Sequence, residues 1–398
     1  MFDVAVIGAG INGCAVSYFL TQAGRSVALI DQDGIAAGGS GAAGAFISPK
    51  FSKGGPLKSL MDDAFDFSLD FYNRHFPEYI TNVPLLHIAR FADENSKVAA
   101  FKQQTHLSTA EIPEAVQEMM TEYANSFESV YLLNDGIVDA KSVCEALASN
   151  AELFIEQIEQ IVYRDGAWYI GDNIRAKKVI ITIGAYKKII DEPYIKMRPV
   201  WGQRIDIKTT TKLDFTLHHQ LSVSPSKADG TLALGATHDV HYHPEEAEKP
   251  YDLEPGRAEL VKKALDSLKL ENIEVINDYT GLRSGSNDYL PLVGKVVKAK
   301  ETLEKIPDIL KGIKVDSGQF EYYPDLYMIN GVGGYGFVQG PYLARMLSRH
   351  ILNDEALNPQ FDPTRFFTRW AKRSAVQELA SKLSKKVVLG CENGELKR

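Results

Sequence analysis

The first thirty residues combine a short apolar run with a helical apolar stripe. Residues 2–7 are mostly apolar and predict a buried strand. Five apolar positions then recur at the spacing of one helix face: Ile11, Cys14, Ala15, Tyr18 and Phe19. The stripe ends near Gly24, and residues 27–30 form a second apolar run. This pattern predicts a strand, a helix and a second strand, the repeating unit of a parallel sheet.

Further apolar runs predict the remaining framework. Residues 179–183 and 326–329 are candidates for buried strands, and "IVYRDGAWYI" is a hairpin candidate with its turn at Asp165-Gly166. Helices are predicted over 56–76, from Pro255 to Leu268, and from about Pro341 onward. Residues 75–130 have a helical and acidic character. The alternation in "GQRIDIKT" and "TLALGAT" predicts antiparallel strands within 198–322.

Glycines stand where the first strand meets the first helix. Gly8, Gly10 and Gly13 spell G-x-G-x-x-G, in which the first allows a tight turn, the second admits a pyrophosphate and the third lets helix and strand approach. Asp31 closes the second strand, where a carboxylate accepts hydrogen bonds from both ribose hydroxyls. The alternative is an α/β protein with an incidental glycine turn. The full context favours a dinucleotide site for NAD or FAD.

Three further glycine segments favour one extended cofactor. The segment "GSGAAGAFISPKFS", from Gly39 to Ser52, has small side chains that let backbone approach a bulky ligand, with Ser40 as a side-chain donor. Gly184 ends the 179–183 run, and the loop "GVGGYG" follows the 326–329 run. Each could be a tight turn by itself. Together they predict a ligand contacted by the first, middle and last parts of the chain.

Composition and charge narrow the class of protein. The chain has 398 residues with 44% hydrophobic and 24% charged residues, as in ordinary globular proteins, and no apolar run long enough to suggest a membrane helix. The net charge is −8, yet residues 365–398 hold nine Lys/Arg against three Glu. This basic tail is either an arm that contacts phosphates or a solvated helix end. No secretory signal opens the chain, and we expect a cytoplasmic protein without a membrane partner.

Cysteine and histidine patterns do not predict a metal site. Cys14, Cys144 and Cys391 are far apart and fit a reducing compartment. In "THDVHYH", strand alternation would place His241 and His243 on one face and His238 on the other, with no obvious carboxylate geometry. Of the three cysteines, Cys144 is the one for which the sequence does not exclude covalent attachment of a flavin. We expect non-covalent binding.

The chain resembles the D-amino acid oxidase superfamily of FAD-dependent oxidoreductases, which includes glycine oxidase and sarcosine oxidase. Within it, the likeness is greatest to the FAD domain of the MnmC family of tRNA-modification enzymes. It covers nearly the whole chain through "VIGAGINGCAVSYFLTQAG", "GSGAAGAFISPKFS", "TIGAY", "PVWGQ", "LALGATHD", "GLRSGSNDYLPLVG" and "GVGGYGFVQGP". One departure is that Ser40-Gly41-Ala42 stands where the MnmC pattern favours Ser-Gly-Asn. The MnmC pattern also includes a methyltransferase domain, which is not legible in this chain.

The resemblance implies FAD as cofactor and an α/β (α+β overall) fold. A Rossmann-like FAD-binding domain, residues 1–74, 131–197 and 323–398, is interleaved with an antiparallel-sheet substrate domain, residues 75–130 and 198–322. The FAD-binding residues that it implies are Gly8, Ala9, Gly10, Ile11, Asn12, Gly13, Asp31, Gln32, Gly39, Ser40, Gly41, Ala42, Ala43, Gly44, Ile158, Thr182, Ile183, Gly184, Arg283, Val332, Gly333, Gly334, Tyr335, Gly336, Phe337 and Val338.

Arg283 in "GLRSGSNDYLPLVG" is the leading candidate for substrate recognition. In glycine oxidase-like proteins the arginine of this motif grips the substrate carboxylate, and a planar guanidinium suits that task. The alternative is a structural ion pair with Asp288. Gln203 is a candidate for the cavity wall or for backbone pairing. Lys50 and Lys53 would place positive charge near the flavin or lie exposed, and Tyr335 would cover the flavin edge or pack.

The resemblance implies a flavin-dependent oxidation of an amine that carries a carboxylate. For the MnmC pattern that amine is the carboxymethylaminomethyl group of wobble uridine in tRNA. The alternative is an oxidase or dehydrogenase of a small free amino acid such as glycine, sarcosine or proline. A third hypothesis is a FAD-binding electron-transfer subunit without amine turnover. Oligomeric state is not encoded in these motifs.

Overall fold

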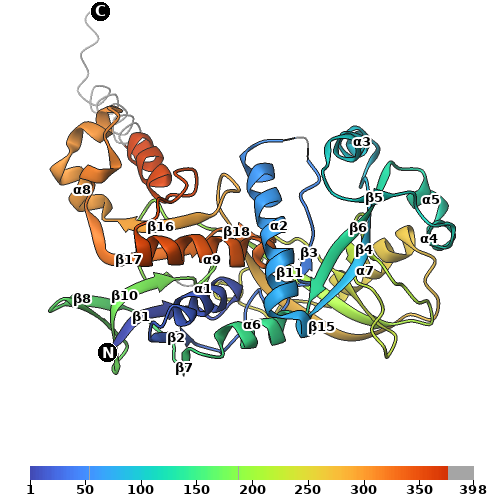
Figure 1. Cartoon of the computed structure of the whole chain (residues 1–398), viewed down its shortest axis with the longest axis horizontal. Helices are drawn as coiled ribbons and strands as arrows, with labels where there is room; N and C mark the ends of the chain where they lie inside the picture. The colour runs from blue at the N-terminus through green and yellow to red at the C-terminus, as the bar shows by residue number, and fades with distance from the viewer. Residues whose placement is uncertain (53, 187, 375–398) are drawn as a thin grey trace, which may run out of the picture.

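Two β-sheets form the two halves of the molecule in the computed structural model, which describes residues 1–52, 54–186 and 188–374 (Figure 1). The first sheet runs in the order β16-β17-β10-β1-β2-β7, with β9 on β10 and β8 on β9. Its strands are β1 (Phe2–Ile7), β2 (Val27–Asp31), β7 (Glu152–Ile155), β8 (Ile161–Arg164), β9 (Ala167–Ile170), β10 (Ile174–Ile181), β16 (Leu292–Val297) and β17 (Tyr322–Asn330).

The centre of the first sheet is parallel, as the apolar runs predict. β1 pairs in parallel with β2 and with β10, and β10 pairs in parallel with β17. Strands covered on both faces need apolar side chains at every position, which explains runs without alternation. The turn at Asp165-Gly166 joins β8 to β9 as predicted, with φ values of 51° and 75°. The third buried strand is longer than its apolar run and ends at Ile181, two residues before the predicted end.

Helices cover one face of this sheet. α1 (Ile11–Gln22), α2 (Pro56–His75), α6 (Ala140–Ala148) and α9 (Gly336–Asn353) pack there in one apolar core. α9 begins five residues before the predicted start, so Pro341 lies inside the helix. Proline lacks an N–H for the carbonyl of Phe337. The hydroxyl of Tyr72 in α2 donates to that carbonyl at 3.0 Å and so replaces the missing partner.

The opposite face is covered by shorter elements. The β8–β9 hairpin, α8 (Ala299–Lys305) and helical residues 364–374 contribute side chains to a second core. The short 3-10 helices are η1 (Pro77–Tyr79), η2 (Ala92–Glu94), η3 (Pro307–Lys311) and η4 (Ser317–Gln319). In the part of the chain that the structure describes, no helix is both long and apolar enough to cross a membrane.

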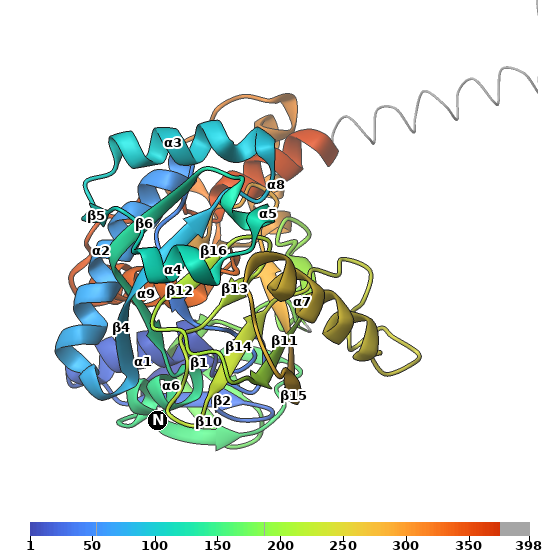
Figure 2. The same ribbon diagram turned by 90° about the vertical axis from the view of Figure 1, so that its right-hand side faces the viewer.

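The second sheet is mostly antiparallel and fills the other half of the molecule (Figure 2). Its order is β18-β15-β11-β14-β13-β12-β4-β6-β3, with β5 on β6. Its strands are β3 (Phe46–Ile47), β4 (Ile80–Ile88), β5 (Thr109–Ala110), β6 (Ser129–Val138), β11 (Arg198–Lys208), β12 (Thr216–His218), β13 (Ser222–Val223), β14 (Thr231–Gly235), β15 (Glu274–Gly285) and β18 (Val332–Gly333). The nearby helices are α3 (Asn95–Gln104), α4 (Glu114–Met119), α5 (Glu122–Asn125) and α7 (Glu254–Ser267).

The helical prediction for residues 75–130 is wrong for β4 and for the start of β6. β4 contains Pro84 and a register shift between Val83 and Leu85, and proline disfavours a helix interior. The predicted division into two interleaved domains stays a proposal. β6 begins before residue 131 and belongs to the second sheet, while β16 lies within 198–322 and belongs to the first.

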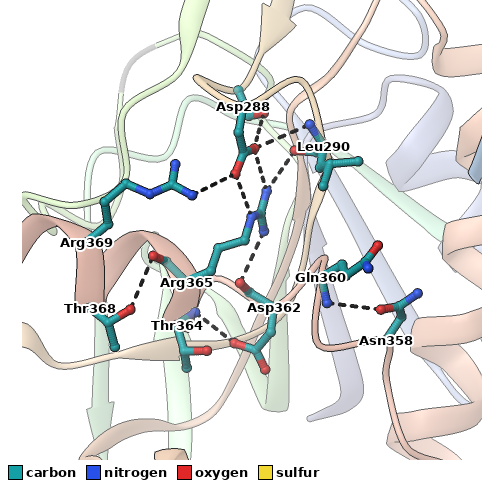
Figure 3. A network of polar contacts seen from close by, with 10 residues as sticks. Asp288, Leu290, Asn358, Gln360, Asp362, Thr364, Arg365, Thr368 and Arg369 are labelled. Carbon is teal, nitrogen blue, oxygen red and sulfur yellow. Dashed lines mark hydrogen bonds and ion pairs between the residues drawn. The ribbon is translucent and has the colours of Figure 1, made fainter. Parts of the chain in front are cut away.

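An ion-pair network ties the C-terminal helical residues to the loop after β15 (Figure 3). Arg365 reaches both carboxylate oxygens of Asp288, at 3.0 and 3.1 Å, and donates to the carbonyl of Leu290 at 2.8 Å. Arg369 lies farther out, 3.5 Å from the same carboxylate. Two cations of the predicted basic tail are thus engaged within the fold. The rest of that tail, from residue 375, lies outside the described residues.

Arg365→Ala should lower the free energy of unfolding by roughly 2 kcal/mol, because it leaves a partly buried carboxylate without its bidentate partner. The side chains of Arg365 and Asp288 are 14% and 21% exposed. Arg369→Ala is the matched control, since its side chain is 45% exposed and such pairs contribute well under about 1 kcal/mol. Urea denaturation of both variants measures the difference. Equal losses would contradict the assignment of Arg365 as the anchor.

Candidate functional site

A cavity of about 630 Å³ lies where the two sheets meet. The ends of β1, β2 and β10 and the loop after β17 form one side of it. Strands of the second sheet, including β11 and β15, form the other side through Gly202, Arg204 and Arg283. In a sheet whose central strands are parallel, ligands bind beyond the carboxyl ends of those strands. The cavity occupies that place.

The glycine turn at the start of α1 is built by direct backbone contact. A Cβ on Gly13 would lie 1.8 Å from the carbonyl oxygen of Gly8, so only glycine lets the helix lie this close to the strand. The helix has no side-chain cap, and no acidic residue stands in its first turn. Its amide groups and positive dipole end therefore suit an anion.

Two side chains hold this turn in place. Asp31 accepts from the N–H of Ala9 at 2.8 Å through one oxygen and from the N–H groups of Asp33 and Gly34 through the other. The hydroxyl of Ser40 accepts from the N–H of Ile11 at 2.9 Å. Asp31 and Ser40 also line the cavity. The strand-end acid and the small-residue segment thus meet at the same helix terminus, as the sequence predicts for a dinucleotide site.

Most of the residues implied for FAD binding line this single cavity. They are Gly8, Gly10, Ile11, Asn12, Asp31, Gln32, Gly39, Ser40, Ala42, Ala43, Gly44, Ile158, Thr182, Ile183, Gly184, Arg283, Val332, Gly333, Gly334, Tyr335, Gly336, Phe337 and Val338. Ala9, Gly13 and Gly41 are not among the lining residues and act through the backbone. A Cβ on Gly41, for example, would lie 2.2 Å from the carbonyl oxygen of Ala36.

The structure does not bring Gln203 into the cavity. Its side chain is fully buried and donates to the carbonyl of Leu253 at 3.0 Å and to Asp278 at 2.7 Å. Its neighbour Gly202 lines the cavity instead. Successive residues of a strand point to opposite faces, so a cavity-facing Gly202 turns Gln203 toward α7. Strand alternation was the signal for this in the sequence.

Arg283 lies on β15 and lines the cavity without the ion pair that its motif also suggested. Asp288 pairs with Arg365, and the guanidinium of Arg283 donates to the carbonyl of Thr237 at 2.9 Å. Burial lowers the pKa of Arg283, and none of the carboxylates that the structure describes forms an ion pair with it. Gly202 makes room beneath it: a Cβ there would lie 2.6 Å from the guanidinium. The side chain is thus a cavity cation without a carboxylate partner among the described residues.

Lys50 and Tyr335 meet across the cavity. Lys50 Nζ donates to the hydroxyl of Tyr335 at 2.5 Å and lies 4.9 Å from the centre of its ring. The two residues come from opposite ends of the chain and both line the cavity. The structure thus joins two of the predicted site residues. Lys53 lies outside the described residues.

Sequence reasoning missed a polar group on the second sheet. Ser48, His87 and His218 line the cavity, and the parallel register of β4 and β12 sets His87 beside His218. Arg90 and Glu94 add an ion pair at the same wall, which lowers the pKa of Glu94 to about 2. These positions lie on strands and turns far apart in the sequence. The strand pairing that unites them has no local signature.

The candidate histidine and cysteine sites lie elsewhere. His238, His241 and His243 stand in the loop between β14 and α7, and His243 contacts the carbonyl of Ala185 at 3.3 Å. Within residues 1–52, 54–186 and 188–374 there is no group of three or more potential metal ligands. Cys14 and Cys144 are buried free thiols that do not line the cavity. Cys391 is outside the described residues.

Comparison with known proteins defines the class. The chain belongs to the DAO family, FAD dependent oxidoreductase, whose family model matches residues 3–350. It is 24% identical over 391 residues to the tRNA 5-methylaminomethyl-2-thiouridine biosynthesis bifunctional protein MnmC of Legionella pneumophila strain Lens. That match covers 92% of this chain and 57% of the relative. The chain therefore spans little more than half the length of the relative it matches.

Solved structures share the fold. Glycine oxidase from Bacillus cereus superposes with a TM-score of 0.71 at 19% identity, covering 89% of this chain and 96% of that chain. Iminodiacetate oxidase from Chelativorans superposes with a TM-score of 0.69 at 17% identity, covering 90% and 98%. The predicted superfamily, the mixed α/β fold and the FAD-dependent oxidoreductase class are confirmed.

The cavity residues fit FAD. The start of α1, whose N-cap residue Gly10 has no side chain, suits the pyrophosphate, Asp31 at the end of β2 suits the ribose, and small side chains from Gly39 to Gly44 leave room beside them. The glycine loop after β17 and residues 182–184 after β10 complete the same wall. All of these segments lie on the first sheet's side of the cavity or at its junction with the second.

Gly13→Ala should raise the Kd for FAD at least tenfold, about 1.4 kcal/mol, because the new methyl group forces α1 away from β1. Gly285→Ala is the control, since its Cβ would meet Arg198 at an ordinary 3.5 Å. FAD retention by flavin fluorescence titration of the apoproteins, with circular dichroism to confirm folding, measures the effect. Unchanged affinity in a folded Gly13→Ala protein would refute the close-approach argument.

Proposed function

We propose that this chain oxidises the C–N bond of a secondary amine that carries a carboxymethyl group. The observation that carries the proposal is Arg283, a cavity arginine that forms no ion pair with any carboxylate that the structure describes. A planar guanidinium matches a carboxylate with two parallel hydrogen bonds. A substrate carboxylate on Arg283 would hold the amine and its α-carbon at the junction of the two sheets, beside the proposed FAD site.

The protein's part in the reaction is to bind, orient and shield the substrate. FAD, held by the start of α1, Asp31 and the small residues from Gly39 to Gly44, would supply the two-electron oxidation of the neutral amine to an imine. Arg283 fixes the carboxylate end, and Gly202 leaves space for the guanidinium beneath it. Lys50 and Tyr335 close another side of the cavity. The imine that remains reacts with water and separates into an amine and an α-keto acid, so that an N-carboxymethyl group leaves as glyoxylate.

The finer proposal is that the amine belongs to tRNA. The likeness to MnmC, whose printed name states a role in tRNA 5-methylaminomethyl-2-thiouridine biosynthesis, supports it. The substrate would be the carboxymethylaminomethyl group of the wobble uridine, and the product its aminomethyl form. Arg365 and Arg369, at the start of the basic segment, are held by Asp288, so contacts with RNA phosphates would fall to other cations.

A small free amino acid is the second candidate. Arg283 would bind the carboxylate of glycine, sarcosine or proline as well as that of an N-substituted glycine, because a guanidinium reads only the carboxylate. The fold shared with glycine oxidase is compatible with this candidate. The two candidates differ in what must enter the cavity and in how open its approach must be.

Anaerobic mixing of the purified flavoprotein with each candidate separates these proposals. Modified tRNA, glycine, sarcosine and proline are added separately, and the visible absorbance of the flavin is followed. Loss of absorbance with carboxymethylaminomethyl-tRNA alone supports the tRNA substrate. Loss with a free amino acid supports the second candidate. No loss with any of them overturns the proposed amine oxidation and favours the electron-transfer subunit.

Arg283→Lys should raise KM for the active substrate about tenfold or more, because an ammonium cannot reproduce two parallel hydrogen bonds. Arg204→Lys is the control. Arg204 also lines the cavity but is engaged by Asp206 at 3.6 Å and by the ring of Tyr279 at 4.0 Å. Steady-state kinetics with the substrate found above measure both. An unchanged KM in Arg283→Lys would remove Arg283 from carboxylate recognition.

A further inference from the structure

A buried carboxyl group stands directly behind the cavity wall of the second sheet. Asp135 on β6 is fully buried, and its Oδ2 lies 3.1 Å from the hydroxyl of Ser48. Ser48 in turn lies 3.0 Å from Nε2 of His218. Ser48 and His218 line the cavity, whereas Asp135 does not. The three side chains therefore connect the cavity wall to the interior of the sheet.

The proton positions along Asp135, Ser48 and His218 follow from one backbone carbonyl. Nδ1 of His218 lies 3.1 Å from the carbonyl of Leu217, which only accepts hydrogen bonds, so Nδ1 carries a proton. In a neutral imidazole Nε2 then accepts, and the single hydroxyl proton of Ser48 points to it. Ser48 would donate to an ionised Asp135. With its proton directed to Nε2, Ser48 must instead accept from Asp135, and Asp135 must be a carboxylic acid. This is the consistent arrangement when His218 is neutral.

The surroundings of Asp135 favour the neutral acid. Burial raises the pKa of Asp135 well above its ordinary value, and Oδ1 has no hydrogen-bond partner among the described residues. Burial also lowers the pKa of His218 to about 4. His87, beside His218 and stacked on Phe51 at 3.6 Å, is the neighbouring titratable group, and its pKa is lowered by burial and by His218. When the cavity holds no net charge, moving a proton from Asp135 to His218 is unfavourable, because it creates two buried charges.

We propose that Asp135, Ser48 and His218 form an internal proton relay that makes the cavity wall cationic when negative charge enters the cavity. The Oδ2–H bond of Asp135 breaks and its proton passes to Ser48, while the hydroxyl proton of Ser48 passes to Nε2 of His218. Asp135 becomes a carboxylate and His218 an imidazolium. No proton enters or leaves the protein, and the relay does not depend on which amine is the substrate.

The two states of the relay differ in where positive charge lies. After the proton transfer the positive charge lies on His218, which lines the cavity, and the negative charge lies on Asp135 behind it. An anion in the cavity therefore favours this state over the neutral one. Electrons delivered to the bound FAD add such negative charge. The relay thus supplies an opposite charge from within the chain, on a part of the wall where the cation Arg90 is already paired with Glu94.

Infrared difference spectroscopy tests the relay without any substrate. The FAD-loaded protein, with and without carboxyl-labelled [4-13C]aspartate, is compared before and after anaerobic reduction by dithionite. In the wild type we expect a carboxylic acid C=O band that shifts with the label, disappears on reduction and is absent in Asp135→Asn. In Ser48→Ala the band should remain after reduction, because the path to His218 is cut.

Ser222→Ala is the matched control. Ser222 lines the same wall and pairs with His218 across β12 and β13, but takes no part in the row. We expect it to lose the band as the wild type does. Three results would each overturn the relay. The wild type shows no protonated aspartate, its band survives reduction, or the Ser48→Ala variant also loses the band on reduction. The flavin spectrum of every variant confirms that FAD is bound, and dithionite keeps this result separate from that of the amine experiment.

Discussion

Contact between two stretches of backbone at the junction of the sheets is the constraint on which the site depends. A Cβ on Gly39 would lie 2.6 Å from the carbonyl oxygen of Leu282, and a Cβ on Gly281 would lie 2.7 Å from the Cα of Gly39. The small-residue segment therefore lies directly against β15. Ala42 belongs to the same contact, 2.9 Å from the position of a Gly281 Cβ. Because β15 also carries Arg283, this contact places the arginine beside the FAD-binding turn.

Local sequence was enough to predict the elements that form the turn. The strand, helix and strand of residues 2–31 follow from periodicity, and Gly13 of the G-x-G-x-x-G motif is required by its close approach to Gly8 within the same turn. The glycine segments after β10 and β17 were predicted to share one ligand, and they line one cavity. Parallel strands explain this success, because their carboxyl ends meet at one edge.

Prediction failed where pairing between distant strands decides the outcome. Ser48, Asp135 and His218 come from β-segments whose proximity depends on the pairing of β4 with β6 and β12, and no local pattern encodes it. Gln203 differs, because strand alternation with Gly202 would have placed its side chain away from the cavity. For Arg283 the sequence left two partners open, and the choice depends on Arg365, which lies more than eighty residues farther along the chain.

The way the chain moves between the sheets has a consequence for how the protein reaches its folded state. β17 lies between β16 and β10 in the first sheet, yet it follows the other described strands of that sheet in the sequence, and β18 follows it directly into the second sheet. Until residues 322–333 have left the ribosome, residues 179–181 of β10 lack their neighbour on the β17 side and the cavity lacks one wall. Contacts of such long sequence separation form slowly. The cofactor site is therefore completed only after residues 322–333 have been synthesised, and until then residues 179–181 of β10 form an open edge.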